Sequence, residues 1–297
     1  MGRVFRGNPV RMPAAIGLAA SLLALPTAAA ASPTVVTVRK TVAVTGAGPT
    51  PATLRCPTKG LALSGYATRL SGGALARDSI PRGVGSWRFN LTSRGRGRAD
   101  LALRCLRVRV PQGLTRVRTG VSTARGRLVV PARSSRTVRL RCARGHLPTG
   151  YGLDRSEAGS AGRNLSLTSA VPAARSWSFR IENAGAATLA GQVRLRCVTE
   201  RARGTRAGGG SATERFSITR VGFTDRVAGA RSLSRRCPSG RASLAAGHYI
   251  RASDDVTLPL GFPAGTRSGR WRVRNPGGGP ERVHTYLSCL SLRTGFR

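Results

Sequence analysis

The feature that most constrains the fold of this chain is a module that occurs three times, in which two cysteines flank a single tryptophan. The first copy runs from Cys56 through Trp87 to Cys105. The corresponding residues of the other two copies are Cys142, Trp177 and Cys197, and Cys237, Trp271 and Cys289. The two cysteines of a copy are 49, 55 and 52 residues apart. Such a regular repeat predicts tandem domains, one for each copy.

In each copy an arginine precedes the first cysteine, a Gly-Tyr step follows it, and an asparagine stands shortly after the tryptophan. These residues are Arg55, Gly65, Tyr66 and Asn90; Arg141, Gly150, Tyr151 and Asn183; and Arg236, Gly247, Tyr249 and Asn275. The module resembles the repeats of secreted actinobacterial proteins of unknown function. That resemblance covers nearly all of the mature chain and implies a secreted β-sandwich with paired cysteines. It implies no activity and no binding residue.

The N-terminal stretch has the three parts of a signal peptide. Arg3, Arg6 and Arg11 supply positive charge, residues 14–25 are apolar, and Ala29 to Ala31 offer a cleavage site of small residues. The apolar segment is too short to span a bilayer, and no later stretch is long and apolar enough to do so. We therefore expect residues 1–31 to be removed and the mature protein to be secreted, either released or retained at the cell wall.

Export to an oxidising compartment favours disulfides when the number of cysteines is even. The repeat selects the pairings within each copy: Cys56 with Cys105, Cys142 with Cys197, and Cys237 with Cys289. A zinc site is the competing interpretation, but zinc ligands cluster at short spacings that these cysteines lack.

Apolar and polar residues alternate over short segments such as Val138–Cys142 and Val193–Cys197, which is typical of strands with one buried face. The sequence therefore predicts an all-β protein of three small antiparallel β-sandwiches of immunoglobulin-like architecture, each with one internal disulfide. We expect Trp87, Trp177 and Trp271 to lie in their cores.

The expected boundaries of the three sandwiches are 33–111, 112–204 and 213–297, with a flexible Gly-rich linker at 205–212. We expect the sandwiches to behave as beads with limited contact. Apolar residues change faces after each closing cysteine, as from Cys105 to Leu106. This switch predicts a bulge or a strand end just after the disulfide.

Charge is the second strong signal. The chain has 50 Lys and Arg against 11 Asp and Glu, for a formal net charge of +39. A GC-rich genome explains the preference for arginine over lysine, but it does not explain the shortage of acidic residues. Several arginines alternate with the bridged cysteines, so we expect them to point away from the core. They are Arg139, Arg141, Arg194 and Arg196 in the second copy, and Arg55 and Arg104 in the first.

The four arginines of the second copy share one face if their strands are neighbours. They divide between two outer surfaces if the strands belong to facing sheets. On either arrangement we expect the exposed arginines to bind polyanions by charge, such as an envelope polymer or an anionic surface. The competing interpretation is a solvated face that only keeps the protein soluble.

No catalytic, cofactor-binding or metal-binding constellation stands out, so we predict a non-enzymatic binding or scaffolding protein of the cell envelope without a cofactor. The one acid–imidazole neighbourhood is His248 with Asp254 and Asp255, which lacks both a catalytic partner set and the spacing of a calcium loop.

Sequence-specific recognition of nucleic acid is not expected, because exposed stacking aromatics are missing and the basic run Arg94–Arg98 fits a hairpin loop. The alternative function is recognition of a protein or a neutral carbohydrate by loops such as 154–163 and 252–261 on a rigid framework.

Overall fold

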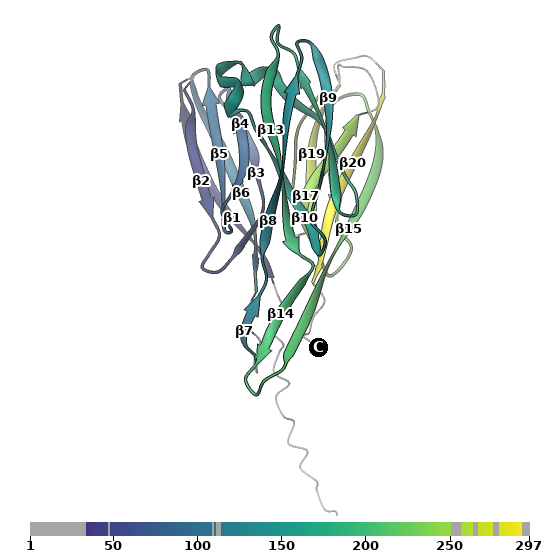
Figure 1. Cartoon of the computed structure of the whole chain (residues 1–297). Coiled ribbons are helices and arrows are strands. Elements are labelled where there is room, and N and C mark those ends of the chain that lie inside the picture. The colour runs from purple at the N-terminus through teal and green to yellow at the C-terminus, as the bar shows by residue number, and fades with distance from the viewer. Residues whose placement is uncertain are drawn as a thin grey trace, which may run out of the picture.

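The computed structural model describes residues 34–46, 48–108, 110, 114–250, 257–263, 267–275 and 279–292. Within these ranges the protein is all-β, with antiparallel sheets and one short 3-10 helix, η1 (Ser156–Asn164) (Figure 1). The signal peptide predicted at residues 1–31 lies outside the described residues.

Eighteen of the strands form three groups of six. The first group is β1 (Thr34–Thr45), β2 (Thr50–Arg55), β3 (Leu61–Ser71), β4 (Ala74–Arg82), β5 (Ser86–Ser93) and β6 (Arg96–Arg107). The second group is β8 (Val121–Val130), β9 (Ser134–Arg141), β10 (His146–Asp154), β11 (Leu165–Pro172), β12 (Ser176–Asn183) and β13 (Leu189–Thr199). The third group is β15 (Ser211–Val227), β16 (Gly229–Arg236), β17 (Arg241–Ile250), β18 (Thr257–Pro263), β19 (Ser268–Asn275) and β20 (Glu281–Leu292). Two further strands are β7 (Leu114–Arg118) and β14 (Arg201–Arg206).

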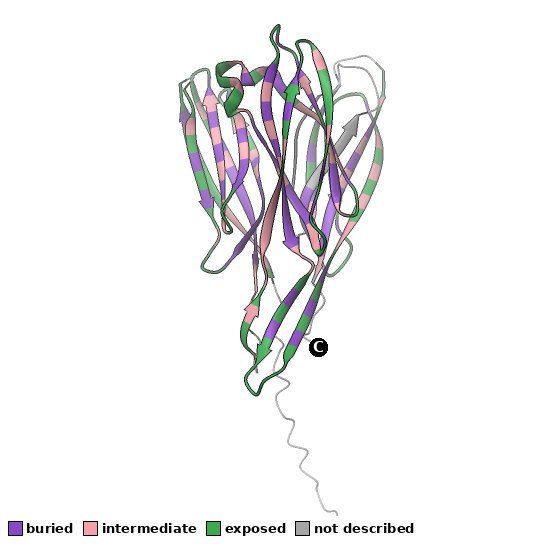
Figure 2. Ribbon diagram, viewed as in Figure 1, coloured by how far each residue is buried: buried purple, intermediate pink, exposed green. Residues whose placement is uncertain are grey.

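The same strand order occurs in all three groups. In the first, β1-β6-β3 packs against β2-β5-β4. In the second, β8-β13-β10 packs against β9-β12-β11, and in the third β15-β20-β17 packs against β16-β19-β18. Each group is therefore a sandwich of two antiparallel layers. A short pairing of β11 with β17 joins one layer of the second sandwich to one layer of the third in a single eight-stranded sheet. In Figure 2, buried positions in purple alternate with more exposed positions along many of these strands.

Each sandwich encloses one disulfide and one fully buried tryptophan. The disulfides are Cys56–Cys105, Cys142–Cys197 and Cys237–Cys289, the pairs that the repeat predicts. In each pair the first cysteine follows the second strand of its sandwich and the other cysteine lies on the sixth strand, so the bond joins the two sheets. Trp87, Trp177 and Trp271 are all 0% exposed.

Loss of a disulfide should destabilise its sandwich. Replacing Cys142 and Cys197 by alanine is expected to lower the free energy of unfolding by about 2–4 kcal/mol, because the bond no longer restricts the unfolded chain. Urea denaturation followed by circular dichroism measures the change, with the wild-type protein under oxidising conditions as the reference. An unchanged midpoint would contradict a stabilising role for this bond.

The three sandwiches are not beads with limited contact, because they share a further apolar cluster. Eight buried residues from all three sandwiches and from β14 form this central cluster: Leu61, Leu63, Leu106, Val198, Ala202, Phe216, Leu244 and Leu290. In addition, β4 contacts β10, β11 contacts β17, and β18 contacts β3. Equivalent strands thus meet in a cyclic arrangement, and each sandwich contacts both others.

The central cluster explains the change of faces after each closing cysteine. The pairing of β1 with β6 runs without interruption through Cys105 and Leu106, so the first alternative, a bulge in the closing strand, is wrong. The second alternative is confirmed, because β6 ends at Arg107, shortly after the disulfide. Leu106 simply lies on the opposite face, which the other sandwiches cover.

Bulges occur instead in the neighbouring strands, at Leu63, Thr149 and Leu244. All three bulged residues are 0% exposed. The Thr149 hydroxyl donates a hydrogen bond to the Leu63 carbonyl at 2.9 Å, and the Ser64 hydroxyl donates one to the Leu244 carbonyl at 2.5 Å. The bulges therefore link one sandwich to the next.

The segment predicted as a flexible linker, residues 205–212, closes a β-hairpin. β14 pairs with the first residues of β15 on one side and with β7 on the other. Gly209 and Gly210 have φ values of 88° and 85°, so these glycines supply a tight turn, not a flexible tether. These strands extend below the sandwiches in Figure 1, and we call them the projection.

Candidate anion-binding site

Three of the six arginines predicted to bind polyanions are exposed. Arg139 and Arg141 lie on β9, and Arg55 ends β2. Arg194 and Arg196 lie on β13, in the facing sheet of the second sandwich. The four arginines of this sandwich are therefore divided between two sheets, which was one of the two arrangements that the sequence left open.

The other three predicted arginines do not face solvent. Arg194 forms an ion pair with Asp154 at 2.7 Å, and its side chain is 15% exposed. Arg196 is 2% exposed, donates a hydrogen bond to the Gly83 carbonyl at 2.8 Å, and lies 6.0 Å from the ring of Trp87. Burial lowers the pKa of Arg196 to about 10.

Arg104 makes the equivalent contact between the first and third sandwiches. It is 1% exposed and donates hydrogen bonds to the hydroxyls of Thr37 and, at 3.3 Å, of Ser243. Burial lowers its pKa, opposed by the nearby Tyr66. The prediction that Arg104 and Arg196 are exposed is thus wrong, because a neighbouring sandwich covers the outward face of each closing strand.

A different set of arginines gathers at a pocket of about 570 Å³ where the projection meets the second sandwich. Five arginines line it together with one acidic residue, and we call it the arginine pocket: Arg118, Arg144, Arg175, Arg201, Arg203 and Glu200. The strands β7 and β14 supply three of these arginines, and two loops of the second sandwich supply the others.

Alternation along the projection fixes the direction of the strand arginines. Ala202 and Phe216 belong to the central cluster, so the intervening positions of β14 and β15 lie on the opposite face. On that face Arg203 is the register partner of Arg118, and Arg201 is the register partner of Arg215. Like charges directly opposite each other in a sheet repel.

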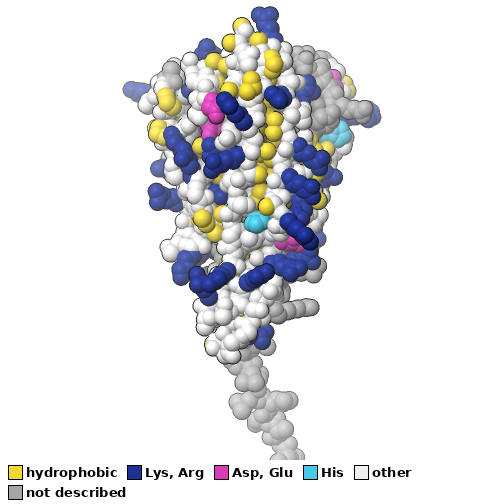
Figure 3. Space-filling view, in the orientation of Figure 1, with side chains coloured by type: hydrophobic (Ala, Val, Ile, Leu, Met, Phe, Trp, Pro, Cys, Tyr) yellow, Lys and Arg dark blue, Asp and Glu magenta, His cyan; other side chains and the backbone are white. Residues whose placement is uncertain are grey.

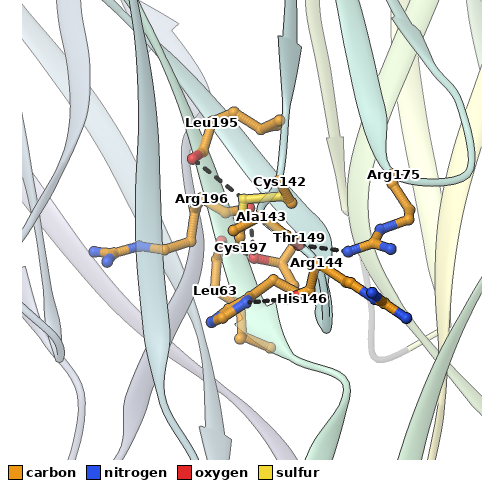
Figure 4. Close-up of a disulfide and its surroundings, with 10 residues drawn as sticks. All are labelled: Leu63, Cys142, Ala143, Arg144, His146, Thr149, Arg175, Leu195, Arg196 and Cys197. Carbon is orange, nitrogen blue, oxygen red and sulfur yellow. Dashed lines mark hydrogen bonds between the residues drawn. A yellow bond between two sulfur atoms is a disulfide. The ribbon is translucent and has the colours of Figure 1, made fainter.

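The Cys142–Cys197 disulfide holds the loops that carry Arg144 and Arg175. The N–H of Cys142 donates a hydrogen bond to the Arg175 carbonyl at 2.9 Å, and the Arg175 guanidinium donates one to the Ala143 carbonyl at 2.6 Å. In Figure 4, Arg144 and Arg175 lie on one side of the disulfide and Arg196 points to the other.

Glu200 does not neutralise the pocket. Its Oε1 accepts two hydrogen bonds from Arg215, at 2.9 and 2.5 Å. Among the residues that the structure describes, no carboxylate forms an ion pair with any of the five lining arginines. The pocket therefore has a net positive charge, with five arginines against one carboxylate, which suits an anion.

The described part of the chain contains no group of three His, Cys, Asp or Glu side chains that could hold a metal ion. The Nδ1 of His146 lies 3.3 Å from the Arg144 carbonyl oxygen, and the Nδ1 of His284 lies 2.9 Å from the Thr224 hydroxyl. Asp254, Asp255 and the side chain of His248 lie outside the described residues.

The sequence predicts two loops, 154–163 and 252–261, that could recognise a protein or a neutral carbohydrate. Residues 156–164 form η1, and the N–H of the preceding Arg155 donates a hydrogen bond to Asp78 of the first sandwich at 2.6 Å. This loop therefore packs between two sandwiches and is not a free binding loop. Most of the second loop, 252–261, lies outside the described residues. Arg94 and Gly95 form the turn between β5 and β6, but these strands lie in different sheets, so the predicted hairpin loop is wrong and the turn connects the two sheets of the first sandwich.

Sequence reasoning missed the arginine pocket because it did not predict the strands β7 and β14, which carry three of its arginines. The available signal was the alternation of arginine in Arg116-Val117-Arg118 and Arg201-Ala202-Arg203, which is typical of strands with one basic face. Arg144 and Arg175 could not be added from the sequence, since only the fold brings their loops to these strands.

Among the described residues, no helix has the length and apolarity needed to cross a lipid bilayer. A scan against protein-family models finds no match for this chain. A search of curated proteins finds none either, so any function must be argued from the geometry of the site.

Proposed function

We propose that this chain is a secreted, non-enzymatic binding or scaffolding protein of the cell envelope that associates with polyanions by charge. We include in the proposal that its three sandwiches are tandem copies of one module of immunoglobulin-like architecture, exported by the signal peptide at 1–31. The identical strand order of the three groups supports the tandem copies. Three disulfides support an oxidising, extracellular environment.

The observation that carries the proposal is the arginine pocket, in which five arginines meet without an acidic partner for any of them among the described residues. The wider surface adds to this field. Lys and Arg side chains are spread over the face shown in Figure 3, and few Asp or Glu side chains appear between them. A surface of one sign raises the local concentration of oppositely charged polymers.

Charge-led binding predicts a strong dependence on salt. The mature chain should be retained on an immobilised polyanion at low ionic strength and eluted at moderate salt, because added ions screen exposed charges. An Arg55→Glu/Arg139→Glu/Arg141→Glu variant is expected to bind the polymer at least about tenfold more weakly, since each change adds repulsion on an exposed sheet face.

The matched control is the triple variant with lysine at the same positions, which keeps the charge and should elute like the wild type. Elution that hardly changes between low and moderate salt would overturn the proposal. Equal weakening by the lysine and glutamate variants would show that side-chain shape, not charge, governs binding.

A further inference from the structure

The arginine pocket has more arginines than carboxylates among the described residues that line it. Arg118 and Arg203 stand directly opposite each other, and Arg201 precedes Arg203 by two residues on the same face of β14. Ala202 in the central cluster anchors β14, while the Cys142–Cys197 disulfide anchors the facing loops. The strands and loops that carry the arginines are thereby held together, so a bound anion would lower a repulsion that solvent and salt screen only in part.

The arrangement of the donors favours phosphate over carboxylate. The guanidinium groups come from two strands and two loops, so they approach the pocket from different sides. A phosphate group has three or more acceptor oxygens in a tetrahedral arrangement and can accept from several such forks at once. A carboxylate has two oxygens in one plane and saturates with fewer partners.

Charge and volume indicate more than one phosphate. A single phosphate monoester carries about −1.5 to −2 at neutral pH, which is less than five guanidinium groups can balance. The volume of about 570 Å³ lies within the usual range of small-molecule sites. We infer that the arginine pocket is a binding site for a unit that carries at least two neighbouring phosphate groups, such as a segment or an end of a phosphate-containing polymer.

This inference adds a specific phosphate site to the proposed function. It rests on that function only for the assumption that the phosphate groups belong to an envelope polymer. The outer arginines would give broad attraction to any polyanion, and the pocket would give selectivity for phosphate.

Calorimetric titration of the oxidised mature chain with inorganic pyrophosphate tests the inference. The pocket variant is Arg118→Gln/Arg203→Gln, and the matched control is Arg94→Gln/Arg96→Gln, which removes the same charge from two exposed positions of the first sandwich that do not line the pocket. We expect about hundredfold weaker pyrophosphate binding in the pocket variant, because two charge-assisted contacts are lost, and little change in the control. Citrate, which carries its charge on carboxylates, should bind the wild type at least about tenfold more weakly than pyrophosphate.

A thermal melt without ligand provides a second readout. Removal of facing like charges should leave the pocket variant at least as stable as the wild type. A lower melting temperature would contradict the repulsion from which the site is inferred. Equal pyrophosphate affinity in the two variants, or equal affinity of the wild type for pyrophosphate and citrate, would overturn the phosphate site.

Retention on long-chain inorganic polyphosphate separates this inference from the proposed function. If the polymer binds in a salt-sensitive manner while pyrophosphate does not bind, the pocket inference fails and the polyanion function stands. If pyrophosphate binds as expected but the polymer is not retained, the pocket stands and association with polymers fails.

Discussion

Gly152→Ala is expected to destabilise the protein by about 3 kcal/mol or more, because a Cβ atom at this position would overlap the backbone of a neighbouring sandwich. Gly152 lies on β10, and an added Cβ would be 1.7 Å from the Ser79 carbonyl oxygen and 2.8 Å from its carbonyl carbon on β4. Backbone atoms cannot move aside as a flexible side chain would. The strands β10 and β4 would have to separate, and the contact between the first two sandwiches would loosen.

Chemical denaturation followed by tryptophan fluorescence measures this effect. Gly95→Ala is the matched control, because Gly95 is in an exposed turn and an added Cβ meets nothing within 4 Å. If both variants unfold at the wild-type midpoint, β4 and β10 do not pack in solution, and the cyclic arrangement of the sandwiches is wrong.

The second large effect concerns Glu214, a buried carboxyl on β15 within the projection, where it pairs with Ala202 of β14. Glu214 is 1% exposed, and neither carboxylate oxygen has a hydrogen-bond partner. Burial raises its pKa from 4.5 to about 7, because the charged form loses its hydration. The folded protein therefore holds this proton more tightly than the unfolded chain does.

The sign of the pH dependence follows from this difference. The contribution of Glu214 to stability is fully present below about pH 4.5 and is lost as the pH rises through about 7. Glu214→Gln removes the ionisation, so above pH 7 this variant should be more stable than the wild type by up to about 3 kcal/mol. Below pH 4.5 the two proteins should have similar stability.

Urea denaturation of both proteins at pH 4 and pH 8.5 measures the difference, and Glu182→Gln controls for the loss of a carboxylate elsewhere. An advantage of Glu214→Gln that is the same at both pH values would contradict a neutral, buried Glu214. So would a variant that is less stable than the wild type at pH 8.5.

The sequence was most informative where one residue type marks one structural role. A cysteine pairs with one partner and a lone tryptophan between two cysteines fills a core, so the repeat was enough to predict the disulfides and Trp87, Trp177 and Trp271 in the interiors. Alternation also assigned the faces of the strands correctly. It could not say what covers the outward face, and for that reason Arg104 and Arg196 were taken as exposed.

The Gly-Tyr steps of the first two copies match in sequence, but they do not occupy equivalent places in the structure. Gly150 pairs with Arg196, whereas in the first copy it is Ser64, not Gly65, that pairs with Arg104. Tyr151 consequently packs 4.8 Å from the Trp177 ring, while a Cβ at Gly65 would lie 2.4 Å from Trp87. The tyrosine of one copy and the glycine of the other thus occupy the same place beside the tryptophan, a one-residue shift that arises from packing and that sequence similarity hides.

The projection has a consequence for how many ligands one molecule can hold. β7 and β14 add to the edge of the sheet that contains β15, whereas the first strands of the other two sandwiches, β1 and β8, have no such additional partners among the described strands. A ring of three separate but identical subunits would carry three such corners, whereas this single covalent ring carries one. We therefore expect one phosphate-bearing unit to bind per chain. The three sandwiches share one strand order, but only one of them carries the strands that form the binding site.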